Sequence, residues 1–225
     1  MSAPSRRLVL GFAAVAALAC GDIAAPSRSE VYDWWLEAPS VPGPGLDTLS
    51  FHWGQDDLPV RVWAEDLEGL PGHMAAAIDV WESAFLYREF QAVLVTDSTG
   101  ADVIVRSGSP PSVVRAKRLH SSLAPECSGA TDLDVDVENR QLRLPIRVFV
   151  ASSLPGDPGI ERCLALTSVH ELGHALGIFA HSADPADIMF ADPGVELPSA
   201  RDQRTAEAAY HTPPTLEVMR LEPLE

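Results

Sequence analysis

One stretch decides both the fold and the chemistry that this chain can support: HELGHALGIFAH, which runs from His170 to His181. Its first two histidines are four residues apart, so on a helix they lie on one face and can reach one metal ion. Glu171 stands beside the first of them and is placed to hold a metal-bound water. Gly177 can end the helix in a left-handed conformation that only glycine adopts cheaply, which turns the chain back towards the same point. Three histidines with an open fourth position predict a catalytic zinc site with the ligands His170, His174 and His181, because structural zinc sites are closed by four protein ligands.

The N-terminal residues have the features of an export signal. Arg6 and Arg7 form a basic region, and uncharged, mostly apolar residues follow as far as Ala19. This run is shorter than the ~20 residues that a membrane-spanning helix needs. We therefore predict a signal peptide over residues 1–19; the alternative is a buried N-terminal helix. The sequence ALACG, residues 17–21, resembles a bacterial lipobox. Cys20 is accordingly predicted to carry a lipid at the cell envelope, with ordinary cleavage and secretion as the alternative.

The use of cysteine agrees with export. The chain has three cysteines, and lipidation of Cys20 would leave Cys127 and Cys163. In an oxidising compartment these two are predicted to form a disulfide. The alternative is two independent buried thiols.

The chain is strongly acidic. Its formal net charge is −16 at pH 7, and removing residues 1–19 takes away two arginines and no acids, which leaves −18. Such a surface argues against binding to nucleic acids or anionic membranes, whose phosphates would repel it. We therefore expect membrane contact only through the lipid. The expected partner is a protein or peptide, and the protein is expected to be a monomer. The acidic residues would allow calcium sites, but their spacing matches no EF-hand, so Ca²⁺ is assigned to no residue.

The rest of the chain, long enough for one domain, alternates between strand-like and helix-like patterns. Residues 20–50 contain several prolines and are typical of a tether, within which Tyr32, Trp34 and Trp35 are expected to dock on the domain. The domain is expected over residues 51–215, followed by a tail over 216–225. Strands are predicted over residues 58–63, 92–96, 101–106, 131–137 and 142–151, and helices over 71–90, 159–176 and 199–210. The last helix begins with Ser199–Asp202, which is typical of a capped start with Asp202 as the capping carboxylate.

Two predictions concern the middle of the chain. Residues 107–130 are expected to form a long irregular loop, and His120 within it is interpreted as a surface histidine rather than a ligand of a second metal. Residues 138–140 are expected to join the strands on either side as a hairpin. The first strand of this hairpin, Thr131–Val137, is rich in acids and suits an exposed sheet edge, because charge there discourages unwanted pairing.

The chain resembles the metzincin metallopeptidases, and specifically the matrixin-like bacterial ones. The match is carried by HELGHALG with His181, by Ala186–Phe190 (ADIMF), which resembles the family's Met-turn, and by the order of elements over roughly residues 50–215. The usual spacing HExxHxxGxxH would place the third ligand at position 180, which is Ala180. The histidine comes one residue later, and we align on His181 because Ser182–Pro185 also resembles the residues after the third ligand in matrixin-like sequences.

The resemblance implies an α+β fold. It would have a twisted, mostly parallel sheet of four to five strands with an antiparallel edge strand, two long helices, the Met-turn and a C-terminal helix. It also implies a zinc endopeptidase in which Glu171 activates the zinc-bound water and Met189 lies beneath the metal. An extended substrate would add to the edge strand, here Thr131–Val137.

Two other functions compete with this interpretation. One is a zinc peptidase whose third ligand is a downstream glutamate, Glu196 or Glu207. The other is a catalytically inactive surface lipoprotein that keeps the same fold as a binding module. A zinc assay combined with a chelator-sensitive cleavage test separates the last alternative from a peptidase.

Overall fold

The computed structural model describes residues 30–40, 43–67, 69–110, 117–121, 127–152 and 159–220, and for residues 117–121, 127, 152 and 159 it describes the backbone alone. The chain divides into two units after Val31, and the second unit, Tyr32–Glu225, holds every strand and helix named below. The predicted signal peptide and the lipidation of Cys20 lie outside the described residues. Within the described ranges, no helix is both long and apolar enough to cross a membrane.

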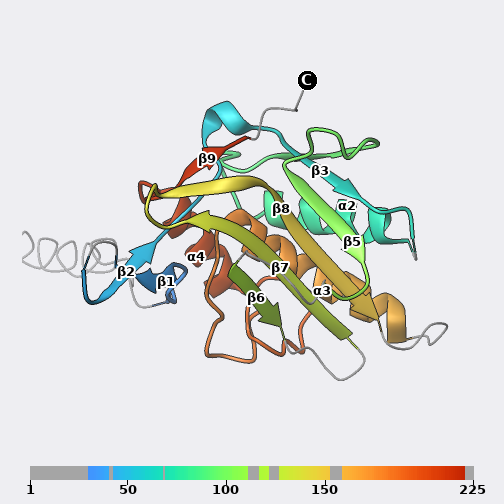
Figure 1. Ribbon diagram of the computed structural model, residues 1–225. Coiled ribbons are helices and arrows are strands. Elements are labelled where there is room, and N and C mark those ends of the chain that lie inside the picture. The colour runs from blue at the N-terminus through green and yellow to red at the C-terminus, as the bar shows by residue number, and fades with distance from the viewer. Residues whose placement is uncertain are drawn as a thin grey trace, which may run out of the picture. The chain divides into compact units, whose positions relative to one another are not determined.

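A seven-stranded, mostly parallel sheet forms the centre of this unit (Figure 1). The strand order is β4-β3-β5-β8-β7-β6, and β9 pairs with β8 beside that path. Only the β8–β7 and β7–β6 pairs are antiparallel. The bounds are β3 Val60–Ala64, β4 Ala92–Val95, β5 Val103–Ser107, β6 Lys117–Ser121, β7 Cys127–Asp136, β8 Gln141–Ser152 and β9 Glu217–Met219. The predicted α+β class is confirmed, but the sheet has more strands than the four to five expected.

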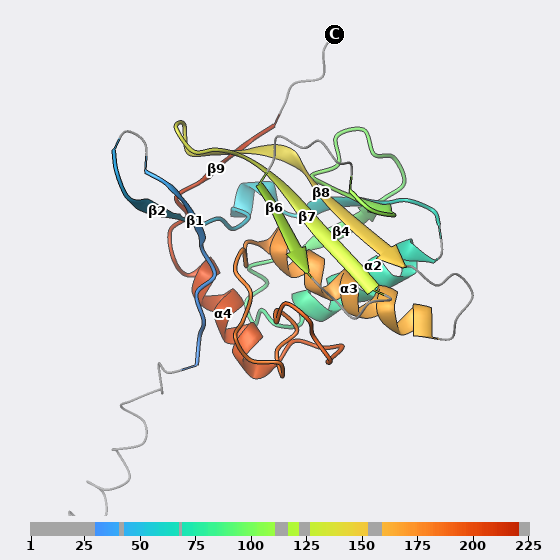
Figure 2. The same ribbon diagram turned by 60° about the horizontal axis from the view of Figure 1, so that its bottom comes forward.

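The helices α2 (Leu70–Glu82) and α3 (Gly159–Leu176) pack on one face of the sheet (Figure 2). The strands turn alternate side chains toward them, and along β8 the buried residues are Leu142, Leu144, Ile146, Val148 and Val150, with Phe149 buried from the other face. This alternation follows from the period of two in a strand, so one face of the sheet becomes the core. Helix α3 has the bounds that the sequence predicts.

Helix α2 is shorter than predicted. It ends at Glu82 rather than Phe90, and Arg88 has a positive φ of 58°, which a helix cannot continue through. Phe85 and Phe90 leave the helical path and both pack against Tyr210, with ring centroids 4.7 and 6.5 Å away. Tyr210 belongs to α4 (Ala200–Tyr210), so a contact between distant parts of the chain ends the helix early.

Part of the predicted tether is instead folded. Strands β1 (Leu36–Pro39) and β2 (Leu46–Leu49) form a separate antiparallel pair, in which Leu36, Ala38 and Leu49 are buried. The expected docking of the aromatic residues before them is confirmed for Tyr32 and Trp34, which pack against the core. Residues 36–40 and 43–49, which lie within the range predicted as a tether, are therefore folded as a strand pair with a buried side.

The edge of the sheet is also different from the prediction. The hairpin of β7 and β8 forms as expected, but β6 pairs with the outer side of β7, with Leu119 opposite Thr131 and Ser121 opposite Gly129. Thus Thr131–Leu133, the first part of the predicted edge strand, is not a free edge, and residues 107–130 are not wholly a loop. A strand of five mostly polar residues has too little periodicity to be recognised in a sequence.

Cys163 on α3 is disulfide-bonded. This excludes the interpretation of Cys163 as an independent buried thiol. The side chain of Cys127, its predicted partner, lies outside the described residues.

Candidate metal centre

Three histidines from two elements come together beneath the sheet. His170 and His174 lie one turn apart on α3, and His181 follows in the turn after that helix. One nitrogen from each ring lies within 4.8 Å of the other two, and the three rings form the only such group of metal-ligating side chains in the described ranges. The structure therefore brings together the three residues that the sequence predicts as ligands.

The two helical histidines are fixed by backbone carbonyls. His170 Nδ1 lies 2.7 Å from the carbonyl oxygen of Ile188, and His174 Nδ1 lies 2.6 Å from that of Ile178. A carbonyl only accepts, so each Nδ1 carries the hydrogen and each Nε2 keeps a lone pair. Burial outweighs the opposing effect of the carbonyls: it lowers the pKa of His170 to about 3 and the pKa of His174 well below its ordinary value. Both rings are thus neutral, as metal ligands must be.

The donor atoms fit a zinc ion. His170 Nε2 is buried and has no hydrogen-bond partner. His174 Nε2 and His181 Nε2 are 3.2 Å apart. Two nitrogens that share a tetrahedral zinc at about 2.1 Å each would be about 3.4 Å apart. An orphaned buried nitrogen is costly without a cation beside it, and the distance between the other two nitrogens suits a shared zinc, so the residues present fit the metal.

The turn that presents His181 is shaped by Gly177. Its φ is +114°, and a Cβ there would clash with the carbonyl oxygen of Phe51. Phe179 stacks on the Phe51 ring, with centroids 6.3 Å apart and planes 6° from parallel. Its backbone N–H donates to the carbonyl of Trp34 at 2.7 Å. The turn is therefore built against residues that come more than a hundred positions earlier in the chain.

Glu171 points away from the helix axis toward β7. Thr131 Oγ1 donates to Glu171 Oε2 at 2.6 Å, and both residues are fully buried. Gly129 lies beside the same carboxylate, because a Cβ at that position would clash with Glu171 Oε1. A glycine at position 129 and a hydroxyl at position 131 thus make room for the carboxylate and hold it. Sequence reasoning finds Glu171 but neither of these supports.

A tight turn lies under the two helical histidines. Phe190 N–H donates to the Asp187 carbonyl at 3.3 Å, which closes a turn with Ile188 and Met189 at its centre. Met189 is fully buried, and a Cβ at Gly173 would clash with its sulfur. Since Gly173 lies between His170 and His174, the thioether packs against the helix at the level of the ligands.

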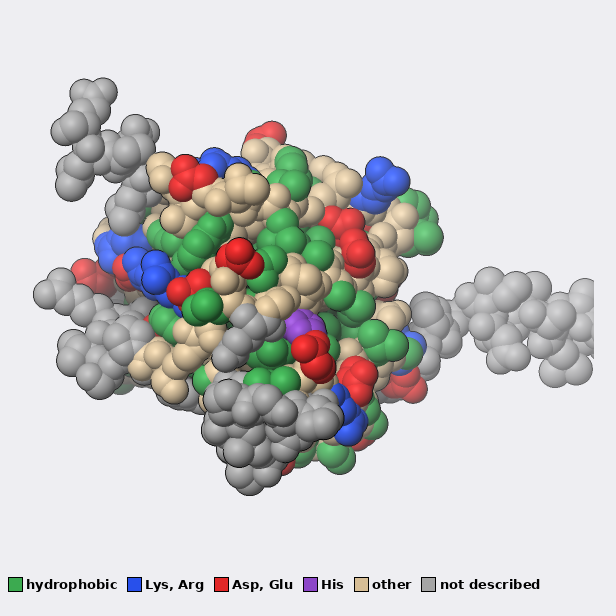
Figure 3. All heavy atoms as spheres, turned by 90° about the vertical axis from the view of Figure 1, so that its right-hand side faces the viewer, with side chains coloured by type: hydrophobic (Ala, Val, Ile, Leu, Met, Phe, Trp, Pro, Cys, Tyr) green, Lys and Arg blue, Asp and Glu red, His purple; other side chains and the backbone are tan. Residues whose placement is uncertain are grey.

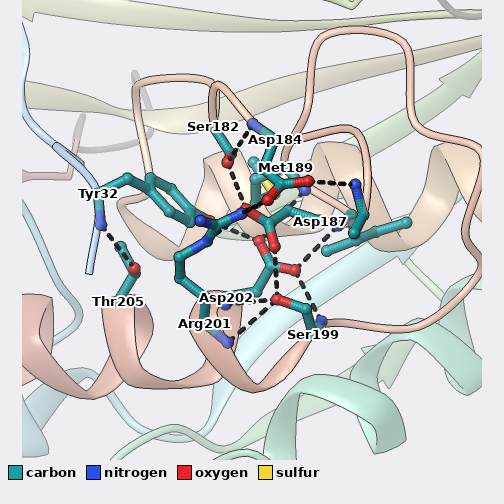
Figure 4. A network of polar contacts seen from close by, with 11 residues as sticks. Tyr32, Ser182, Asp184, Asp187, Met189, Ser199, Arg201, Asp202 and Thr205 are labelled. Atoms are coloured by element: carbon teal, nitrogen blue, oxygen red, sulfur yellow. Dashed lines mark hydrogen bonds and ion pairs between the residues drawn. The ribbon is translucent and has the colours of Figure 1, made fainter. Parts of the chain in front are cut away.

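A buried carboxylate holds this turn from below (Figure 4). Asp202 accepts hydrogen bonds from the backbone N–H groups of Ile188, at 2.9 Å, and Ser199, at 2.7 Å. Ser199 Oγ in turn accepts from the N–H of Asp202, which confirms the predicted capping carboxylate of α4. Sequence reasoning recognises the cap, but it misses that the same carboxylate supports the peptide whose carbonyl orients His170.

The remaining sequence candidates lie apart from the three histidines. Glu196, one of the two rival ligands, is paired with Arg162 at 2.7 Å and is exposed. Glu207, the other rival, is on α4 and belongs to no group of metal-ligating side chains in the described ranges. The side chain of His120 lies outside the described residues. Within Thr131–Val137, along which the resemblance would add a substrate strand, Thr131–Leu133 is paired with β6.

The surface beyond the site shows no concentrated charge on the face seen in Figure 3, where acidic, basic and apolar side chains are interspersed.

No model of a known protein family matches the sequence, and no curated protein matches it significantly. Function is therefore inferred from the residues and geometry of the histidine cluster.

Proposed function

We propose that the protein is a zinc-dependent endopeptidase of the metzincin type, similar to the matrixin-like bacterial enzymes. The observation that carries this proposal is the convergence of His170, His174 and His181, whose ligand atoms lie within 4.8 Å of one another. The order of the ligand helix, the tight turn with Met189 and the C-terminal helix also agrees with that family.

The three histidines would hold zinc, which on neutral imidazoles acts as a Lewis acid and lowers the pKa of a bound water to roughly 7. Glu171 is the general base in this proposal. Its carboxylate would accept the proton of the attacking water and pass it to the leaving amine. The hydrogen bond from Thr131 to Oε2 holds the carboxylate in one orientation.

We further propose that the enzyme acts outside the cytoplasm, as a secreted protein or a lipoprotein anchored through Cys20. The signal-like residues 1–19 motivate this, and the disulfide at Cys163 supports it, because disulfides persist mainly in oxidising compartments.

The test is cleavage of a peptide library by the zinc-loaded protein, with and without a chelator. In Glu171→Gln we expect full zinc content and a loss of cleavage of about 10²–10⁴-fold, the usual contribution of a general base. Glu196→Gln is the matched control and should keep both zinc and activity. Undiminished cleavage by Glu171→Gln would remove it as the base. A zinc-loaded wild type that cleaves nothing would favour the inactive binding module, and loss of zinc in Glu196→Gln would favour the rival ligand.

A further inference from the structure

The residues just before β1 reach two separate supports of the metal centre. Tyr32 lies against α4, and Trp34 lies against the turn between Gly177 and His181. Both side chains pack on the core. No part of the zinc chemistry requires these residues, so their position needs its own explanation.

The first contact is with the turn that presents His181. Phe179 is 2% exposed, and its N–H is the donor to the Trp34 carbonyl at 2.7 Å. A buried N–H without an acceptor is destabilising, so the turn depends on Trp34 for its conformation. The carbonyl of the preceding residue, Ile178, is the group that orients His174. The hydrogen bond that Phe179 donates to Trp34 therefore helps to position two of the three ligands.

The second contact is with the turn that orients His170 (Figure 4). The Tyr32 hydroxyl donates to Asp202 Oδ1 at 2.7 Å, while Asp202 Oδ2 accepts from the Ile188 N–H. The Ile188 carbonyl lies against His170 Nδ1. Burial, and then the Asp202 charge, raise the pKa of the Tyr32 phenol above its ordinary value, so the hydroxyl remains a donor.

We propose that Tyr32–Trp35 is a positioning segment of the metal centre, which sets the affinity of the three histidines for zinc through Asp202 and the turn after Gly177. This rests on the proposed function for the identity of the metal. It goes beyond it by making the centre depend on residues some 140 positions upstream of the first ligand. Tyr32 and Trp34 are positioning residues, because they act only through other groups.

The main test is Tyr32→Phe, which removes the hydroxyl and keeps the ring. Tyr87→Phe is the matched control, since the Tyr87 side chain is exposed. We expect zinc affinity, measured by competition with a chromogenic chelator, to fall about tenfold in Tyr32→Phe, the lower end of the effect of losing an outer-shell partner. The visible spectrum of the Co²⁺-loaded protein should also change. In an Asp202→Asn background, Tyr32→Phe should have no further effect, because the hydroxyl acts through Asp202.

A second variant tests the Trp34 contact without changing a side chain. An ester in place of the peptide bond between Trp34 and Trp35 weakens the Trp34 carbonyl as an acceptor and leaves the peptide between Ile178 and Phe179 intact, and we expect faster zinc release. An ester between Glu82 and Ser83 weakens the Glu82 carbonyl, which accepts from the Phe85 N–H at 3.2 Å, and should leave zinc release unchanged.

The outcomes separate the two proposals. If Tyr32→Phe and the ester after Trp34 lower only the melting temperature, with zinc affinity and the Co²⁺ spectrum unchanged, the segment is merely structural and the positioning role is wrong. A wild type that binds zinc but cleaves no peptide would overturn the proposed function and leave the positioning role standing. A wild type that binds no zinc would overturn both.

Discussion

The three candidate ligands fall into two kinds of environment. His170 and His174 are fully buried on one face of α3, and each has its Nδ1 on a backbone carbonyl. His181 is half-buried in a turn, and no group in the described part of the chain bonds to its Nδ1. The helix thus fixes two ligands by its own geometry, whereas the third is placed by contacts of the turn with other segments.

This difference shows where the site gets its rigidity. A helix holds residues four apart in one relative position whatever surrounds it. The turn has no such internal constraint, and its conformation depends on Gly177, on Phe51 and on Trp34. We therefore expect replacement of a helical ligand to affect the stability of the apoprotein, and replacement of His181 itself to affect metal binding with less effect on the apoprotein.

The largest expected effect comes from removing a ligand. His170→Ala and His181→Ala should each lower zinc affinity on the order of 10³-fold, a share of the ~10–16 kcal/mol typical of a zinc site. The apoproteins should differ. His170→Ala leaves a cavity and an unpaired Ile188 carbonyl and should lose about 2–3 kcal/mol of unfolding free energy in urea. His181→Ala should stay within about 1 kcal/mol of the wild type. Equal destabilisation by the two substitutions would contradict the comparison.

The next effect concerns the turn itself. Gly177→Ala forces a side chain into a left-handed conformation and against the Phe51 carbonyl, so we expect a loss of about 3 kcal/mol or more in unfolding free energy. The zinc affinity of the folded fraction should fall as well, because the turn that carries His181 must move. In Gly194→Ala, by contrast, the new Cβ meets nothing within 4 Å, and the change should stay within about 0.5 kcal/mol. A fully stable Gly177→Ala protein with normal zinc affinity would show that the turn tolerates another path.

The smallest effect tests the carboxylate beside the first ligand. Thr131→Val keeps the shape of the side chain and removes the donor to Glu171 Oε2. A hydrogen bond to a charged group contributes about 1.5–3 kcal/mol, so kcat should fall about tenfold while zinc content stays complete. Steady-state kinetics on a cleaved peptide measures this, with zinc determined on the same samples. Loss of zinc together with activity would mean that Thr131 supports the ligands rather than the base.

The best-predicted elements are those whose pattern is local. The bounds of α3 and the capped start of α4 agree with the prediction, because helical periodicity and a Ser–x–x–Asp cap act over a few residues. The sequence does not predict the strands β1, β2, β6 and β9, which each contain at most one β-branched or aromatic residue. The equally short strands β3, β4 and β5 each contain two or three such residues and are predicted.

The same distinction holds within the site. The sequence predicts the three histidines and Glu171, because their spacing on and after one helix brings them together. It does not predict that Thr131 holds Glu171 or that Tyr32 holds Asp202. These partners are 40 and 170 positions apart, and only the folded chain brings them into contact.

Two buried tryptophans pack against α3, so their fluorescence can report on the helix that carries two of the candidate ligands. Trp81 Nε1 donates to the Val169 carbonyl at 2.8 Å and Trp53 Nε1 donates to the Ala175 carbonyl at 3.0 Å. These carbonyls belong to the residues directly before His170 and directly after His174, so each indole is hydrogen-bonded next to a ligand. Quenching of tryptophan emission by Co²⁺ or Cu²⁺ in a stopped-flow instrument would follow ion entry in real time, without any added dye or label.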